Sequence, residues 1–252
     1  MLDTEAVNIE IVITATRRPD LLDKTLYSFR KNLFGAIDTT VLLNIDPVGM
    51  HCNSHEVLKV ALDYFPNVIW RSPPLPNFAG AFQWGWRHVS SDADYVFHLE
   101  DDWELLRPID LSVLLEILES EKDLALLRLP NFYSGRDRMK NWNKFFPWNG
   151  KYYECPEELK QAVGFCGHPS LIKAEYVRRI APFLSAESNP EKQFHHNNTK
   201  VVGEVLKWRY GVYGEPSLPP FIRDLGRRWM IDKGFKKQGN KAFFMTWEKT
   251  GG

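Results

Sequence analysis

The sequence predicts an α/β protein with a mostly parallel β-sheet flanked by helices. Two observations carry this prediction. Over the first hundred residues, short stretches rich in β-branched residues alternate with stretches of helical spacing, which is the pattern of consecutive strand–helix–strand units. The chain also has 44% hydrophobic and 13% aromatic residues over 252 positions, enough to bury a sizeable core in one large domain or two small ones.

The elements follow one another regularly in this first part. Apolar and β-branched runs predict strands at 9–14, 40–47, 68–70 and 95–99. Apolar residues three to four positions apart predict the connecting helices, at 21–33, 54–65 and 77–90. Because each helix joins consecutive strands, we expect the strands to be parallel, in a doubly wound sheet.

A cluster of carboxylates ends the fourth strand. Glu100, Asp101 and Asp102 follow an apolar run, and an apolar strand interior would not hold three adjacent carboxylates. They are therefore expected where the strand emerges, which in an open α/β sheet is where ligands bind. Clustered carboxylates raise one another's pKa unless a cation compensates, as Mg²⁺ or Mn²⁺ bound with phosphate oxygens would. For the tripeptide alone, the alternative is a solvated acidic turn.

Polar residues also end the first two strands. Thr16 and Arg17 lie between a strand and a helix, where backbone N–H groups and cations can bind an anion, although an ordinary turn is equally consistent. Asp46 ends the second strand and could accept a hydrogen bond from a base or a ribose, or simply start a turn. The third helix begins at Asn77 with small residues at the positions nearest a ligand.

The second half of the chain is less regular. A helix is predicted at 111–118 and a strand at 124–129. Aromatic residues are dense between 130 and 156, and we expect most of these rings in the core and one or two in a site, where they could stack on sugars or bases. The rings belong to Phe132, Tyr133, Trp142, Phe145, Phe146, Trp148, Tyr152 and Tyr153.

Two candidate glutamates follow a glycine-containing segment. The segment 164–172 holds two glycines beside a histidine and a serine, which suggests close backbone approach to a ligand, and a helix is predicted at 174–183. Glu191 follows Pro190 in the first turn of another helix, whose dipole could keep it ionised. An ordinary helix-stabilising glutamate is equally consistent. Glu204 is expected further along the same helix.

Composition and charge exclude several classes of protein. Lys+Arg and Asp+Glu both number 32, so no global attraction to nucleic acid or anionic membranes is expected. Three cysteines without a CxxC pair favour a reducing compartment. Residues 1–10 do not read as a signal peptide and no apolar run approaches the roughly 20 residues of a membrane span, so we expect a cytoplasmic protein. The GxGxxG and GxxxxGK[ST] fingerprints are absent from the sequence.

The segment 222–241 is basic although the whole chain is neutral. Such a segment suggests a phosphate partner, whereas a solvated helix end is the more usual role of a run of this kind. Its basic residues are Arg223, Arg227, Arg228, Lys233, Lys236, Lys237 and Lys241.

Several segments together resemble the GT-A glycosyltransferases, specifically family 2-like enzymes. They are the strand and loop at 11–19, the helix at 21–33, the strand end at 43–46, the helix start at 77–86 and the acidic strand end at 99–103. The resemblance covers residues 8–105 and, more loosely, the remainder. It implies a single GT-A domain with a nucleotide-sugar-binding half at 1–105 and an acceptor-binding half at 106–252.

The resemblance also implies roles for individual residues. Glu100-Asp101-Asp102 matches the family's DxD motif with glutamate in the first position, so Asp102 is the first expected ligand of Mn²⁺ or Mg²⁺, with Glu100 and Asp101 able to reach the ribose or metal-bound water. Asp224 stands where related enzymes have a metal-binding histidine, and it is expected as an oxygen ligand. Nucleotide-sugar contacts are expected from Thr14, Thr16, Arg17, Asp46, Asn77, Gly80, Glu100, Asp101, Arg227 and Arg228.

The implied activity is transfer of a sugar from a nucleotide sugar, with a UDP-sugar as the expected donor, to an acceptor hydroxyl. Glu191 or Glu204 would act as general base, and direct displacement would invert the anomeric carbon. The acceptor class stays open among glycan, lipid, protein and nucleic acid. Three alternatives remain: a glycosyltransferase acting on a hydroxymethylated nucleic-acid base, a nucleotidyltransferase, and a non-catalytic nucleotide-sugar-binding module.

Overall fold

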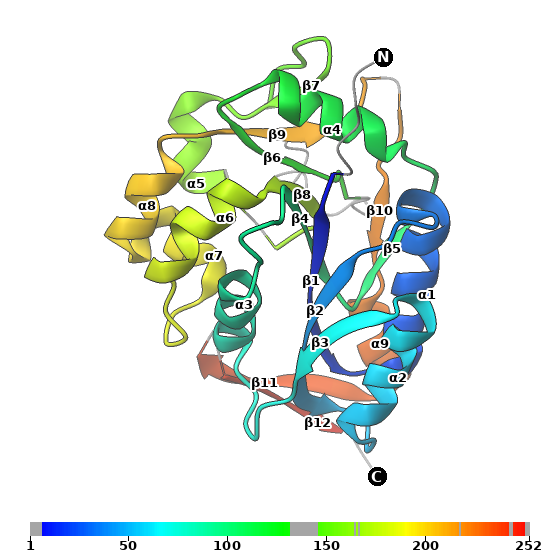
Figure 1. The fold of residues 1–252 in the computed structure, drawn as a ribbon. Helices are drawn as coiled ribbons and strands as arrows, with labels where there is room; N and C mark the ends of the chain where they lie inside the picture. Colours follow the sequence, from blue (N-terminus) through cyan, green and yellow to red (C-terminus); the bar gives the residue numbers. More distant parts are fainter. Residues whose placement is uncertain are drawn as a thin grey trace.

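The computed structural model describes residues 7–131, 146–163, 165, 167–216, 218–241 and 244–249. In these residues, an eight-stranded mixed sheet forms the centre of the fold, with helices on both faces (Figure 1). In spatial order its strands are β3 (Asn67–Arg71), β2 (Thr40–Gly49), β1 (Ile9–Arg17), β4 (Tyr95–Glu100), β8 (Ser170–Lys173), β6 (Leu124–Arg128), β9 (Arg209–Tyr213) and β7 (Tyr152–Glu154). Two small sheets pair β5 (Trp103–Leu105) with β10 (Ile222–Asp224), and β11 (Phe235–Lys241) with β12 (Phe244–Lys249).

The helices cover both faces of the large sheet. They are α1 (Pro19–Phe29), α2 (Ser54–Tyr64), α3 (Phe78–Arg87), α4 (Leu111–Ser120), α5 (Lys160–Val163), α6 (Ala174–Ile180), α7 (Pro190–Lys192), α8 (Thr199–Val205) and α9 (Gly226–Asp232), with short turns η1 (Arg30–Phe34), η4 (Glu157–Leu159), η5 (Ala181–Phe183) and η6 (Gln193–Asn197). Among the described helices, none combines the length and the apolar character that crossing a bilayer would require.

Two hydrophobic clusters fill the space between the sheet and its helices. Ile11 and Ile13 of β1 pack with α1, α2 and α4 on one face, while Val12 packs with α3, α6 and α8 on the other. Because both faces are covered, residues along β1 are buried whichever way they point. This explains why the first strand reads as a continuous apolar run rather than as an alternation.

The predicted parallel arrangement of the first hundred residues is confirmed. β1, β2 and β3 are parallel neighbours, and β4 pairs in parallel with the other edge of β1. The chain moves outward from β1 to β3 and then returns through α3 to β4 on the opposite side of β1. This reversal of strand order leaves room for a ligand at the carboxyl ends of β1 and β4.

The second half corrects the sequence-based prediction in two places. β8 runs antiparallel between β4 and β6, where the sequence predicts only a segment leading into a helix, because four residues are too few to show a period. The prediction that a single helix carries both Glu191 and Glu204 is wrong. The Asn198 side chain accepts a hydrogen bond from the N–H of Val201 at 3.2 Å and starts a separate helix, α8, which carries Glu204.

The aromatic segment is partly described. Phe146 and Tyr152 are buried, Tyr153 is half-buried, and Trp148 is 43% exposed. Two of the four described rings are therefore in the core, and core packing of most of the eight stays a prediction. Phe132, Tyr133, Trp142 and Phe145 lie outside the described residues.

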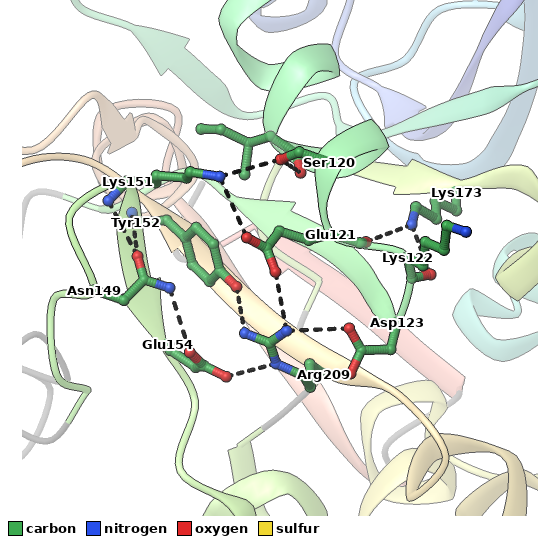
Figure 2. Close-up of polar contacts among 11 residues, drawn as sticks. Ser120, Glu121, Lys122, Asp123, Asn149, Lys151, Tyr152, Glu154, Lys173 and Arg209 are labelled. Carbon is green, nitrogen blue, oxygen red and sulfur yellow. Dashed lines mark hydrogen bonds and ion pairs between the residues drawn. The ribbon is translucent and has the colours of Figure 1, made fainter.

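Arg209 on β9 ties the far edge of the sheet together (Figure 2). Its guanidinium donates hydrogen bonds to Glu154 of β7 at 2.6 Å, to Glu121 and Asp123 before β6 at 3.1 Å each, and to the hydroxyl of Tyr152 at 2.8 Å. The hydrogen bond from Arg209 holds the pKa of Glu154 below its usual value. This cluster is satisfied internally and stabilises the joint between β7, β9 and the turn after α4.

Candidate functional site

Polar side chains lie together at the edge of the sheet where β1, β2 and β4 have their carboxyl ends. Thr14 of β1 lies opposite Glu100 of β4, and Thr16 lies opposite Asp46 of β2. β4 ends at Glu100, so the next two carboxylates emerge at the same edge of the sheet. The carboxyl ends of these three parallel strands therefore meet at one edge of the sheet.

A cavity of about 280 Å³ lies at this edge. Five carboxylates that the sequence singled out line it, although they come from β2, β4, the turn after β4 and α7. They belong to Asp46, Glu100, Asp101, Asp102 and Glu191. Its lining residues are Thr14, Ala15, Thr16, Arg18, Asp46, Val48, Pro76, Phe78, Ala81, Glu100, Asp101, Asp102, Glu191 and Trp247.

A buried ion pair between Arg18 and Asp101 organises the loop after β1. Arg18 donates to both oxygens of Asp101 and, at 3.1 Å, to Asp102 Oδ2. Thr16 donates its N–H (2.9 Å) and its hydroxyl (3.0 Å) to Asp101 Oδ2. The Arg18 and Asp101 side chains are only 5% and 2% exposed. Asp101 is therefore bonded by donors of the protein itself, and Glu100 and Asp102 line the cavity beside it.

Burial acts on both partners of this ion pair. Burial alone would lower the pKa of Arg18, but the neighbouring Asp101 and Asp102 carboxylates outweigh it and raise that pKa above its usual value. Burial raises the pKa of Asp101, against the opposing effect of Arg18 and the Thr16 N–H. Four hydrogen bonds donated to one carboxylate favour its ionised form, so we describe the contact as an ion pair.

Asp102 lies against the start of α9. Its backbone carbonyl accepts a hydrogen bond from the N–H of Leu225 at 2.8 Å. A Cβ atom on Gly226 would overlap Asp102 Oδ2, so only glycine leaves room for the carboxylate. Asp224 directs its own Oδ1 to the N–H of Gly226 at 2.7 Å, where it caps α9.

Glu100 and Glu191 meet at Gly167. The N–H of Gly167 donates to Glu191 Oε1 at 2.9 Å. A Cβ on Gly167 would lie 2.7 Å from Glu100 Oε1 and 3.7 Å from Glu191 Oε1. The backbone at Gly167 therefore closely approaches two carboxylates of the cavity, whereas the predicted close approach of this segment to a ligand stays a prediction. Gly164 lies outside the described residues.

Asp46 is oriented by two amide groups. Its Oδ1 accepts from the side chain of Asn44 at 2.9 Å, and its Oδ2 from the backbone N–H of Asn77 at 3.0 Å. Burial raises its pKa in spite of these two hydrogen bonds. The side chain of Asn77 in turn accepts from the N–H of Gly80 at 2.8 Å and caps α3. Asn77 and Gly80 thus shape the loop that presents Asp46 to the cavity.

The residues fit a divalent cation in part. Glu100 and Asp102 line the same cavity, and Mg²⁺-like ions are commonly held by one or two carboxylates together with phosphate oxygens and water. Thr14 Oγ1, in the same lining, is buried with no hydrogen-bond partner in the described part of the chain. No group of three or more His, Cys, Asp or Glu residues that could hold a metal was found among the described residues, so protein groups alone would not complete the coordination.

Other predicted residues lie elsewhere. Glu204 pairs with Lys207 at 2.6 Å, and Arg228 pairs with Asp232 on the exposed side of α9. Arg17, Arg227 and Arg228, like Glu204 and Asp224, are not among the described residues that line the cavity. Their proposed roles stay predictions without a contact that supports them.

The sequence interpretation missed Arg18 and the apolar side of the cavity. It named Arg17, whereas the next arginine, Arg18, is the one that lies inward and donates to Asp101 and Asp102. The apolar side consists of Val48, Pro76, Phe78 and Trp247. Trp247 comes from the far end of the chain, and nothing in its local sequence signals a cavity.

Comparisons with solved structures show that the described part of the chain has a GT-A-like glycosyltransferase fold. S. aureus TarS superposes with a TM-score of 0.58 and 9% identity over 86% of this chain and 36% of TarS. TarS 1–349 in complex with UDP-GlcNAc gives 0.55 and 8% over 94% of this chain and 60% of the other. The mannosyltransferase PcManGT from Pyrobaculum calidifontis, in complex with GDP-Man and Mn²⁺, gives 0.56 and 12% over 90% and 61%.

Sequence comparison adds no closer relationship. No protein-family model matches the chain, and no curated protein matches it significantly. The chain spans between about a third and three fifths of the length of these three structural neighbours.

Proposed function

We propose that this chain is a metal-dependent glycosyltransferase that moves a sugar from a nucleotide-sugar donor to an acceptor hydroxyl. The observation that carries the proposal is the single cavity that Glu100, Asp102 and Glu191 share at the carboxyl ends of parallel strands. The common fold supports it, because solved neighbours are in complex with UDP-GlcNAc in one case and with GDP-Man and Mn²⁺ in another.

The donor's diphosphate would lie at the acidic side of the cavity, where Glu100 and Asp102 would hold the cation. When bound, Mn²⁺ or Mg²⁺ would neutralise the negative charge that develops on the departing diphosphate. The chain itself would orient the ligands: Arg18 holds Asp102 through one hydrogen bond and is in turn fixed by Asp101. Asp224 is a weaker candidate ligand, since its carboxylate already caps α9.

Glu191 would act as the general base. Its Oε1 accepts the Gly167 N–H, which fixes the side chain at the edge of the cavity. The carboxylate would take the proton from the acceptor hydroxyl as that oxygen attacks the anomeric carbon. Attack from the side opposite the diphosphate would invert the anomeric configuration. Glu204 is not favoured for this role, because it pairs with Lys207 on α8.

The test is titration calorimetry with UDP-, GDP-, TDP- and CDP-sugars, first in Mn²⁺ and then in EDTA. We expect one donor, a UDP-sugar first, to bind in Mn²⁺ and to bind at least about 10-fold more weakly, though still measurably, in EDTA; Asp102→Asn in Mn²⁺ should be weakened to a similar extent. Asp232→Asn is the matched control, since it removes an α9 carboxylate that is not among the described lining residues and pairs with Arg228, and it should keep the affinity.

A measurement of turnover distinguishes a glycosyltransferase from a non-catalytic binding module. We expect slow donor hydrolysis by the wild type and at least about 100-fold less with Glu191→Gln at unchanged donor affinity, as for loss of a general base. Donor binding without hydrolysis or transfer to any acceptor would favour a non-catalytic binding module. Failure of every nucleotide sugar to bind in Mn²⁺ would overturn the proposal.

A further inference from the structure

The cavity lining combines acidic and apolar residues. Glu100 and Glu191 meet at Gly167. Val48, Pro76, Phe78 and Trp247 supply apolar surface elsewhere in the lining, and Asp46 lies two residues before Val48 on β2. A carboxylate acceptor beside apolar and aromatic walls suits a flat ring with a polar edge, which is the chemistry of a nucleobase.

Trp247 reaches this position through the C-terminal hairpin. In Figure 1, β11 and β12 lie across the end of the sheet where β1 and β2 finish, and β12 contacts β2. The Trp247 ring lies 4.8 Å from the guanidinium of Arg18. Trp247 therefore touches the residue that organises the acids while it also borders the cavity.

Aromatic contacts anchor the hairpin. Trp229 of α9 stacks on Phe235 of β11 with ring centroids 5.4 Å apart and planes within 2°. The Trp247 ring lies 6.0 Å from Trp229 and 6.1 Å from Phe235, tilted by more than 50° to both. The Trp229 indole N–H donates to Asp20 of α1 at 3.0 Å. The Trp247 ring is thus packed against two rings, those of Trp229 and Phe235, that are not among the described lining residues of the cavity.

We propose that Trp247 is a nucleobase-binding residue and that the C-terminal hairpin completes the donor site. This inference rests on the proposed function and adds to it a residue from outside the segments that resemble known glycosyltransferases. The base lies against the Trp247 ring with its polar edge toward Asp46, and the diphosphate extends toward Glu100 and Asp102. Because every base offers a flat π face, Trp247 contributes affinity rather than choice of base.

The experiment is calorimetric titration of the full chain with UDP and GDP, each in Mn²⁺ and in EDTA. The variants are Trp247→Phe, which keeps a flat ring, and Trp247→Leu, which keeps apolar bulk against Trp229 and Phe235 but has no π face. Trp148→Leu is the control, because this ring is 43% exposed and is not among the described lining residues. Thermal unfolding of each variant reports on folding.

We expect Trp247→Leu to bind the preferred nucleotide about 5- to 100-fold more weakly, which corresponds to the loss of one base–aromatic contact. The factor should be the same in Mn²⁺ and in EDTA, whereas Asp102→Asn should weaken binding only in Mn²⁺. Trp247→Phe should stay within a few-fold of wild type, and Trp148→Leu should be unchanged.

Three results would overturn the inference. Trp247→Leu could bind as tightly as wild type, in which case the hairpin is not part of the site although the proposed function stands. Trp247→Phe could lose as much affinity as Trp247→Leu, which would indicate a packing role rather than a stacking one. If the wild type bound neither nucleotide in Mn²⁺, both the inference and the proposed function would fail.

Discussion

Arg18 and Asp101 show how much one residue's role depends on its surroundings. The resemblance gave the three adjacent carboxylates related roles, with Asp102 as the first metal ligand, yet Asp101 is almost completely buried although all three line the cavity. The difference arises because Asp101 turns back toward the N–H of Thr16 and the guanidinium of Arg18. One acid of the motif is therefore structural, and it holds the loop that carries the others.

Asp101→Asn should be strongly destabilising. It leaves the buried Arg18 cation without its main partner, and breaking a buried ion pair on one side costs about 3–5 kcal/mol. The free energy of unfolding in urea measures this. Asp102→Asn is the control, because its side chain is 20% exposed and shares a single hydrogen bond with Arg18. It should cost about 1 kcal/mol, and equal losses in both variants would contradict the structural role of Asp101.

Glycines at the ends of elements decide where the site's carboxylates lie. Gly167 precedes β8 and leaves space for Glu100, and Gly226 begins α9 and leaves space for Asp102. In both cases the helix or strand approaches so closely that a Cβ atom would take the place of a carboxylate oxygen. Packing between elements, rather than a motif within one element, sets the position of these acids.

Gly226→Ala should weaken metal-dependent nucleotide binding at least about 10-fold, since the methyl group displaces Asp102 and a misplaced metal ligand typically costs 10–100-fold in affinity. Calorimetry with UDP in Mn²⁺ and in EDTA measures the effect, and binding in EDTA should change little. Gly203→Ala on α8 is the control, because a Cβ there meets nothing within 4 Å and should leave binding unchanged. Wild-type affinity in Gly226→Ala would show that Asp102 is not a ligand.

The Arg209 cluster acts between elements far from the cavity. Arg209→Met should lower the free energy of unfolding at pH 7 by about 1–2 kcal/mol, a value reduced by partial exposure of the charges. Arg179→Met, which removes an exposed pair with Glu175 within α6, should cost less than about 0.5 kcal/mol.

The contribution of the Arg209 cluster to the free energy of unfolding should depend on pH in a defined direction. Arg209 holds the pKa of Glu154 below its usual value, so the contribution is complete above the ordinary glutamate pKa of about 4.3 and is lost as the pH falls through the folded-state pKa. The stability difference between wild type and Arg209→Met should therefore shrink in acid. A difference that stays constant from pH 7 to pH 3 would contradict this account.

At the scale of the whole molecule, the C-terminal segment closes back on the first helix. Asp20 of α1 accepts the Trp229 indole N–H with both carboxylate oxygens at 3.0 Å and pairs with Lys233 at 3.1 Å. This joins α9 and the hairpin to the element that follows Arg18. The basic segment that suggested either a phosphate partner or a solvated helix end therefore has a third role in the fold, which is to carry the hairpin.

Asp20→Leu should loosen the C-terminal segment. Loss of both contacts lowers the free energy of local opening, so limited trypsin digestion should cleave faster at Lys233 and Lys236 while the thermal midpoint of the rest changes little. Asp232→Asn is the control, since it removes only an exposed pair with Arg228. Unchanged digestion of Asp20→Leu would show that other contacts hold the segment.

The parallel half of the fold, and the meeting of several polar residues at one edge of it, could be predicted from the sequence. Periodicity is local, so the alternation of strands and helices up to β4 could be read from neighbouring residues. Parallel strands end at one edge of a sheet, and for that reason Thr14, Thr16, Asp46, Glu100 and Asp102 could be expected together. Glu191 was singled out by its helix start, although its distance from these residues was unknown.

Features that depend on contacts between distant segments could be seen only in the folded structure. β8 is too short to show a period and forms because β4 and β6 lie on either side of it. Arg18 lies inward because it binds Asp101 and Asp102, more than 80 residues along the chain, and Trp247 reaches the cavity because the hairpin packs across the strand ends. Register and long-range packing arise from the free energy of the whole folded chain, and residue spacing carries no direct record of them.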